Sequence, residues 1–228
     1  LDATRGRFMK KTIDWFKREG AGLSDADKAR LEKVNVELTE VTTRFSQNVL
    51  DSTNVFELIV ADRAKLAGLP ERAIAAAAAS AQSKGRTGYR FTLQAPSYVP
   101  LLTYLDDAGI REQVYRAMNT RATHEPHDNR ALVARILELR REKAKLLGYP
   151  DFVDLVLLDR MAQVGERAHS FVVDLESRTQ SAFARENAEL ERFAGRKLNP
   201  WDVAYYSEKQ RLSRYALDEE ELRPYFAL

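Results

Sequence analysis

The chain has 228 residues, of which 44% are hydrophobic, and this composition is sufficient to fill a core. Its 36 basic and 34 acidic residues leave a net charge of only +2, and the two signs alternate without forming blocks. Because phosphate binding usually shows as a concentrated basic face, we do not expect nucleic acid to be a partner.

Neither cysteine nor a long apolar run occurs. The absence of cysteine excludes disulfides, thiol nucleophiles and thiolate metal sites, and it fits a reducing compartment, so we expect the cytoplasm. The longest apolar run, Ala73 to Ala79, is far shorter than the roughly 20 residues of a membrane span, so no membrane partner is expected. The chain begins without methionine and closes with LRPYFAL, and we expect both ends to continue in a longer chain.

Helical periodicity dominates the first part of the chain. Ser24, with Asp27 three residues on, has the pattern of a capping box and predicts a long amphipathic helix over 25–50. Its apolar positions are Leu31, Val34, Leu38, Val41, Phe45 and Val49. A shorter helix is expected before it, ending near Gly20 or Gly22.

Two short β-rich runs interrupt the helices, VFELIV at 55–60 and YRFTL at 89–93. The alanine-rich segment 71–84 between them favours helix. We therefore expect a small two-strand element beside a helical bundle, with the direction of pairing left open.

The remaining segments predict helices. They cover 101–109, 110–122, 129–147 with Asp128 as its cap, 166–193, and 201–217 after a break at Asn199-Pro200. In the helix 166–193 the residues expected to face inward are Phe171, Leu175, Thr179, Phe183, Leu190 and Phe193. The predicted fold class is mainly α, a multi-helix bundle of long amphipathic helices with a small two-strand β element.

The stretch THEPH contains two of the three histidines, His124 and His127. A zinc-peptidase box has the form HExxH, in which two histidines four apart project from one helix face. Here the spacing is three, and Pro126 opposes a continuous helix. We interpret the stretch as a polar connection, and we expect no metal site in this chain.

No catalytic residue can be assigned from the residues themselves. His169 is alone on its helix, and no GxSxG, GxxxxGK[ST] or GxGxxG pattern occurs. Trp201, Tyr205 and Tyr206 in PWDVAYYSEKQ have the helical spacing of a core face, while substrate binding is the weaker alternative for the two tyrosines.

Taken in order, nine segments resemble the oligopeptidase A branch of the zinc oligopeptidase family, which includes thimet oligopeptidase and neurolysin. They are RFSQNVLDST at 44–53, LAGLPE at 66–71, PSYVPLLTY at 96–104, REQVYRAMNTRA at 111–122, DN at 128–129, ILELRREKAKLLGY at 136–149, MA at 161–162, PWDVAYYSEKQ at 200–210 and LRPYF at 222–226.

The resemblance implies a largely helical enzyme in two halves around a deep channel, in which a zinc-bound water hydrolyses short peptides. The family's HExxH box and its other catalytic groups come after the segment that resembles LRPYF. By this resemblance, residues 1–108 are part of the helical N-terminal half. Residues 109–228 are the beginning of the catalytic region, without its zinc site, and we expect the two parts to form one continuous helical structure.

The resemblance therefore predicts a piece of a zinc oligopeptidase that forms scaffold and channel wall. It binds no zinc and is inactive alone, and its partner is the missing C-terminal catalytic half of the same protein. The alternative is a naturally truncated helical module that binds peptides or proteins without catalysis. The resemblance leaves open whether the parent is an endopeptidase or a dipeptidyl carboxypeptidase.

Overall fold

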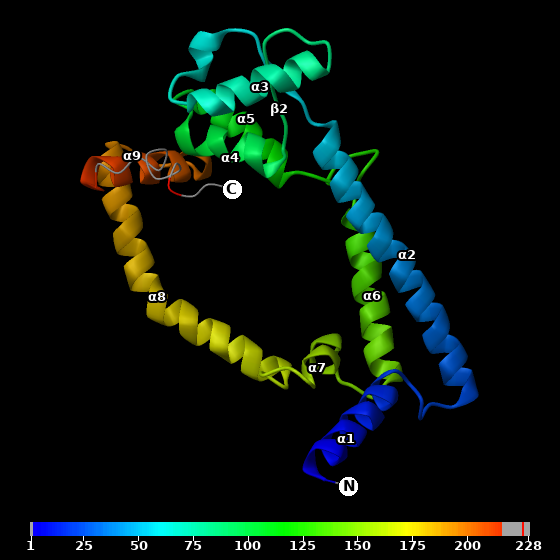
Figure 1. Cartoon of the computed structure of the whole chain (residues 1–228). Helices are drawn as coiled ribbons and strands as arrows, with labels where there is room; N and C mark the ends of the chain where they lie inside the picture. Colours follow the sequence, from blue (N-terminus) through cyan, green and yellow to red (C-terminus); the bar gives the residue numbers. More distant parts are fainter. Residues whose placement is uncertain (1, 216–224, 226–228) are drawn as a thin grey trace. The chain divides into compact units, whose positions relative to one another are not determined.

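The computed structural model describes residues 2–215 and Tyr225, and their fold is mainly α-helical with a small two-strand sheet, as predicted (Figure 1). The end of the predicted helix 201–217 and most of the segment 222–226 lie outside the described residues. Among the described helices, none combines the length and the apolar composition that a membrane crossing requires.

The chain divides into two compact units, each built from two stretches of sequence. Unit 1 contains Leu1–Asn48 and Asp128–Arg178, and unit 2 contains Val49–His127 and Thr179–Leu228. Two long helices, α2 (Asp25–Val55) and α8 (Gly165–Ala194), pass from one unit to the other. The division near residue 108 that the family resemblance implies refers to the longer enzymes, and it stays a prediction.

Unit 1 is helical. Besides the first parts of α2 and α8 it contains α1 (Ala3–Arg18), α6 (Arg130–Leu146) and α7 (Phe152–Leu157). Asp2, Ser24 and Asp151 begin α1, α2 and α7, because the side chain of each accepts a backbone hydrogen bond from the first turn of its helix. Its buried apolar side chains are Leu31, Val34, Ile136, Leu139, Ala144 and Leu155.

Helices α2 and α6 lie side by side (Figure 1) and are joined by polar contacts. Arg135 on α6 binds Glu37 on α2 with two hydrogen bonds of 2.6 and 2.7 Å. Asp128 caps α6 as predicted, because its carboxylate accepts from the backbone N–H of Arg130 at 2.9 Å. Asn129, directly before α6, makes no cap hydrogen bond with its side chain. Buried Asn129 instead uses its amide against α2, donating to Phe45 O at 3.0 Å and accepting from Asn48 at 2.8 Å.

Unit 2 holds the sheet and a compact apolar core. Its elements are β1 (Leu58–Val60), η1 (Arg63–Leu66), α3 (Glu71–Ser83), β2 (Tyr89–Phe91), α4 (Ala95–Tyr104), α5 (Ala108–Asn119), η2 (Pro200–Asp202) and α9 (Val203–Tyr215). The strands pair antiparallel with Ile59 opposite Arg90. Apolar side chains from both strands, η1 and α3 to α5 form the core, among them Leu66, Phe91, Leu101, Leu105 and Val114.

Two expected boundaries in this unit differ from the structure. The predicted strand 55–60 is shorter, because α2 continues to Val55 and pairing begins only at Leu58. Helix α4 begins at Ala95, before the predicted start at 101, with Pro96 in its first turn, where the missing N–H costs no hydrogen bond.

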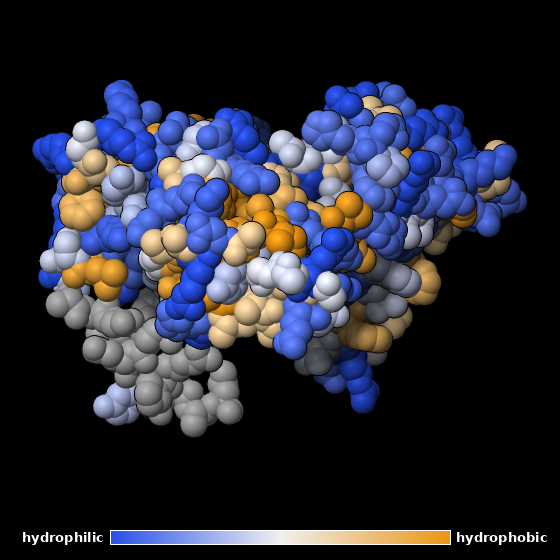
Figure 2. Space-filling model, turned by 90° about the horizontal axis from the view of Figure 1, so that it is seen from above, coloured by the Kyte–Doolittle hydropathy of each residue, from blue (hydrophilic) through white to orange (hydrophobic). Residues whose placement is uncertain are grey.

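The inward face predicted for α8 was wrong. Leu190 is buried, but Phe171, Leu175, Phe183 and Phe193 are 43 to 69% exposed. The amphipathic period is present in the sequence, yet no described element covers this face along most of the helix. Apolar patches among hydrophilic residues are also visible on the face of the molecule shown in Figure 2.

Candidate functional site

The THEPH stretch lies in the connection between α5 and α6, as predicted. Helix α5 ends at Asn119 and α6 begins at Arg130, so His124 and His127 do not share a helix face. His124 is exposed, and its Nδ1 lies 2.9 Å from Thr123 Oγ1. The paired imidazoles that an HExxH helix presents to a metal are therefore not formed here.

The described residues do not fit a zinc ion. Within 2–215 and 225, no three histidine, cysteine, aspartate or glutamate side chains lie close enough together to hold a metal. His169, the third histidine, is exposed on α8. A catalytic zinc needs three protein ligands, so we assign no step of any reaction to metal held by these residues.

Tyr205, one of the two weak substrate-binding candidates, belongs to a polar cluster in unit 2. Its hydroxyl donates to Asp106 Oδ1 at 2.6 Å, and Lys209 Nζ lies 3.3 Å from the same oxygen. The Arg111 guanidinium stacks over the Tyr205 ring, 4.1 Å from its centroid. Tyr206 meets Tyr205 edge to face, and Arg196 lies over its ring.

The centre of the cluster is a buried ion pair. Arg111 on α5 is 1% exposed, Asp202 at the end of η2 is fully buried, and Arg111 Nη2 donates to Asp202 Oδ1 at 2.6 Å. Arg111 also donates to the backbone oxygens of Leu105, Asp106 and Trp201. Because both charges are buried and each is bonded several times, the pair holds α9 against the end of α4 and the start of α5.

The other carboxylate oxygen of Asp202 completes a capping box. It accepts from the backbone N–H of Asn199 at 3.2 Å and lies 2.9 Å from the Arg196 guanidinium. Burial alone would raise the pKa of Asp202, but the hydrogen bonds from Arg111, Asn199 and Arg196 outweigh it and hold the pKa below its ordinary value. Asp202 is therefore ionised at neutral pH.

The cluster also fixes the protonation state of Tyr205. Burial and the hydrogen bond to Asp106 raise the pKa of its phenol, while the hydrogen bond from Tyr205 lowers the pKa of Asp106. The phenol is therefore a neutral donor at physiological pH and is engaged by Asp106. The arrangement can position α9, and substrate contact by Tyr205 or Tyr206 stays a prediction.

Sequence reasoning missed the pair that organises this cluster. The pattern Asn199-Pro-Trp-Asp202 could have identified Asp202 as the acidic member of a capping box. No local signal could have identified Arg111, because the two partners are 91 residues apart.

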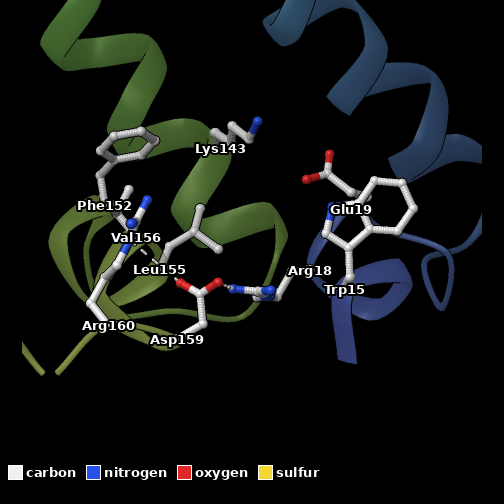
Figure 3. Close-up of a pocket in the computed structure, with 9 residues that line it drawn as sticks. All are labelled: Trp15, Arg18, Glu19, Lys143, Phe152, Leu155, Val156, Asp159 and Arg160. Carbon is white, nitrogen blue, oxygen red and sulfur yellow. Dashed lines mark ion pairs between the residues drawn. The ribbon is translucent and has the colours of Figure 1, made fainter. Parts of the chain in front are cut away.

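A second candidate lies in unit 1, in a hollow of about 280 Å³ (Figure 3). Trp15 on α1 and Phe152 on α7 lie on opposite sides of it, and Leu155 lies between them. The Arg18 guanidinium and the Asp159 carboxylate, 3.1 Å apart, form the ion pair drawn in the same view. This hollow combines aromatic walls with charged groups, so it offers both an apolar surface and charges to a bound group.

Comparison with known proteins identifies the family. Residues 101–228, more than half of the chain, match the model of peptidase family M3. The chain belongs to peptidase family M3. It is 42% identical over 228 residues to "Oligopeptidase A" of Haemophilus influenzae, a match that covers 96% of this chain. The family assignment made from the nine segments is thereby confirmed.

Other members of the family are also similar along nearly the whole chain. "Oligopeptidase A" of Escherichia coli is 40% identical, with 98% of this chain covered, and "Dipeptidyl carboxypeptidase" of Escherichia coli is 33% identical, with the whole chain covered. The matches cover 34% of the Haemophilus protein, 35% of the Escherichia coli oligopeptidase and 34% of the carboxypeptidase. The M3 chain described here thus spans about a third of these relatives.

Proposed function

We propose that this chain is part of a zinc-dependent oligopeptidase that hydrolyses short peptides, and that it contributes scaffold and channel wall to that enzyme. The similarity to Oligopeptidase A over 96% of the chain carries this proposal. The oligopeptidase branch is favoured because the identity to it exceeds the identity to dipeptidyl carboxypeptidase.

The chain alone is inactive in this proposal. Its three histidines occur in no HExxH pattern, and the residues described do not fit a metal ion. Zinc and the groups that stabilise the tetrahedral intermediate come from the part of the family that this chain does not cover. That part is the partner we propose, and the lack of cysteine supports the cytoplasm as its location.

The contribution of this chain is steric and structural. The core of unit 2 packs α3, α4 and α5 together, and the Arg111–Asp202 pair holds α9 against them. Such rigid packing suits a wall that must keep its shape while peptides enter and leave. The activity itself belongs to the longer protein.

The experiment compares the 228-residue chain with the product of the complete gene. Both are incubated with an internally quenched fluorescent peptide, with and without a zinc chelator, and the zinc content of each is measured by elemental analysis. We expect chelator-sensitive cleavage and bound zinc only for the longer protein. Chelator-sensitive cleavage by clean 228-residue chain would contradict the assignment of catalysis to the uncovered part.

Reading the gene beyond the codon for Leu228 separates the two hypotheses. A continued reading frame that encodes HExxH is expected from the oligopeptidase proposal. A stop codon directly after Leu228 would favour the truncated binding module.

A further inference from the structure

One face of α1 forms the basic wall of a second hollow in unit 1. This hollow has a volume of about 680 Å³, and the opposite wall contains Tyr149, Leu158 and Asp159. Its cations come from a single helix face, because their positions follow steps of three and four. They are Arg7, Lys10, Lys11, Lys17 and Arg18. We refer to this hollow as the basic groove.

The carboxylates of the basic groove do not neutralise it. Asp14 is paired with Lys10 at 2.6 Å and Asp159 with Arg18 at 3.1 Å. Arg7 and Lys11 are exposed and have no partner among the described residues. Five cations against two carboxylates leave three positive charges in excess.

The charge of the groove acts on its own acids. The hydrogen bond from Lys10, with the charges of Lys17 and Arg18, lowers the pKa of Asp14. The hydrogen bond from Arg18 likewise lowers the pKa of Asp159. A second carboxylate brought into this groove would experience the same favourable potential.

The basic groove adjoins the aromatic hollow of Figure 3, since Arg18 and Asp159 line both. On Arg18, Nη1 binds Asp159, but the buried Nε has no hydrogen-bond partner in the described part of the chain. A guanidinium has five N–H donors, so Arg18 has capacity for a further acceptor. Beyond this ion pair lie the rings of Trp15 and Phe152.

We propose that the two adjoining hollows bind a short acidic peptide that carries an aromatic or large apolar residue. Its carboxylates lie against Arg7 and Lys11, and its apolar side chain enters between Trp15 and Phe152. The volume of the basic groove is within the usual range of ligand sites, roughly 300 to 1,000 Å³.

A nucleic acid fits these observations less well. Asp14 and Asp159 lie among the cations, and Glu19 lines the adjoining hollow. A continuous phosphate backbone would bring its regularly spaced charges against these carboxylates, whereas a peptide places its charges individually. That the site captures substrates of the longer enzyme rests on the proposed function. Binding of the peptide by this chain does not depend on hydrolysis.

The test measures binding to the 228-residue chain by fluorescence anisotropy. The probe is the blocked peptide Glu-Glu-Phe-Glu-Glu with an uncharged dye, compared with counterparts in which Gln or Lys replaces every Glu. We expect the acidic peptide to bind most tightly and to weaken as salt is added, because exposed charges are screened. Equal affinity for the acidic and Gln peptides would overturn the proposal, as would tighter binding of a single-stranded oligonucleotide.

Matched variants locate the site. Arg7→Gln with Lys11→Gln removes two exposed cations of the groove, and Lys33→Gln with Arg44→Gln removes two exposed cations of α2 that have no partner among the described residues. We expect the first pair to weaken binding of the acidic peptide about tenfold, since each exposed charge contributes modestly. Equal weakening by the second pair would show a net-charge effect and contradict the proposed site.

Tryptophan emission tests the apolar half of the site. In a Trp201→Phe background Trp15 is the remaining tryptophan. We expect its emission to shift when Glu-Glu-Phe-Glu-Glu binds and to remain unchanged with a Glu-Glu-Ala-Glu-Glu peptide. The same response to both peptides would contradict the placement of the aromatic residue. Absence of hydrolysis by the longer protein, in contrast, would bear only on the proposed function.

Discussion

Arg111 and Asp202 are 91 residues apart in the sequence, yet their side chains form a fully buried ion pair of 2.6 Å. This pair joins α5 to η2, directly before α9. Arg111 also donates to the backbone oxygens of Leu105 and Asp106, and Asp202 also accepts from the backbone of Asn199 and pairs with Arg196. The stability of this region depends on both partners, because either one alone would be a buried charge without a counter-charge.

Asp202→Asn is expected to lower the free energy of unfolding by about 3–5 kcal/mol, because the substitution leaves Arg111 buried without a counter-charge. Urea denaturation followed by circular dichroism measures the change. Glu71→Gln is the matched control, since Glu71 pairs with Arg63 at the surface, and its loss is expected to cost less than about 1 kcal/mol. Similar losses in the two variants would contradict the central role of the buried pair.

Stability is expected to fall in acid. The folded chain holds the pKa of Asp202 and of Asp106 below the ordinary value of 3.8, so protonation favours the unfolded chain. Their contribution is therefore complete above that value and is lost as the pH falls below it. Denaturation midpoints measured across the acid range should show this slope, and Asp202→Asn should reduce it. An unchanged slope in that variant would exclude Asp202 as a source.

Tyr205→Phe is expected to destabilise the chain by about 1–3 kcal/mol, because it removes a hydrogen bond to a charged carboxylate while the ring over Arg111 remains. Tyr215→Phe is the control, since Tyr215 lies on the same helix and is 70% exposed. Thermal unfolding compares the two. In the longer enzyme, an increase in KM with unchanged stability would instead support the substrate-binding alternative for Tyr205.

Gly68→Ala is expected to cost several times more than Gly85→Ala. Both glycines have positive φ, where a side chain costs about 1 kcal/mol. A Cβ at Gly68 would also lie 2.3 Å from Tyr104 O and 2.8 Å from Asp106 Oδ1, whereas nothing lies within 4 Å of one at Gly85. Equal unfolding free energies for the two variants would show that the close approach of Gly68 to Tyr104 and Asp106 does not constrain the fold here.

The exposed apolar face of α8 is expected to promote self-association of the isolated chain. Phe171→Gln with Leu175→Gln should reduce self-association in analytical ultracentrifugation without loss of stability, because both side chains are already largely exposed. Leu190→Gln on the same helix should instead destabilise, since Leu190 is buried. Unchanged association of the double variant would show that this face is not the contact.

The helices were largely predictable because their signals are local. Ser24 and the apolar steps after it predicted α2, and Pro126 predicted the break between α5 and α6. Asp128 likewise predicted the start of α6, where it accepts from the Arg130 N–H. The contacts of Asn129 with α2 were not predictable, because a pattern local to α6 does not tell which residues lie beside it.

The candidate sites were much less predictable. The basic face of α1 is present in the sequence as charges at steps of three and four, but whether it faces solvent or a wall depends on where Tyr149 and Asp159 lie. The sequence indicated Tyr205 as an aromatic residue of a helix face. Its contacts with Asp106 and Arg111 were not predictable, because these partners come from a distant part of the chain.

The sequence by itself determined the helical character of this protein, most of its breaks and its membership of peptidase family M3, since local propensity, capping and the order of the nine segments are properties of the chain. Only the tertiary structure decided which charges are buried together, which apolar faces are covered and which cations share a groove. Burial and Coulomb interaction depend on distance in space, and Arg111 and Asp202, 91 positions apart in the sequence, are in direct contact.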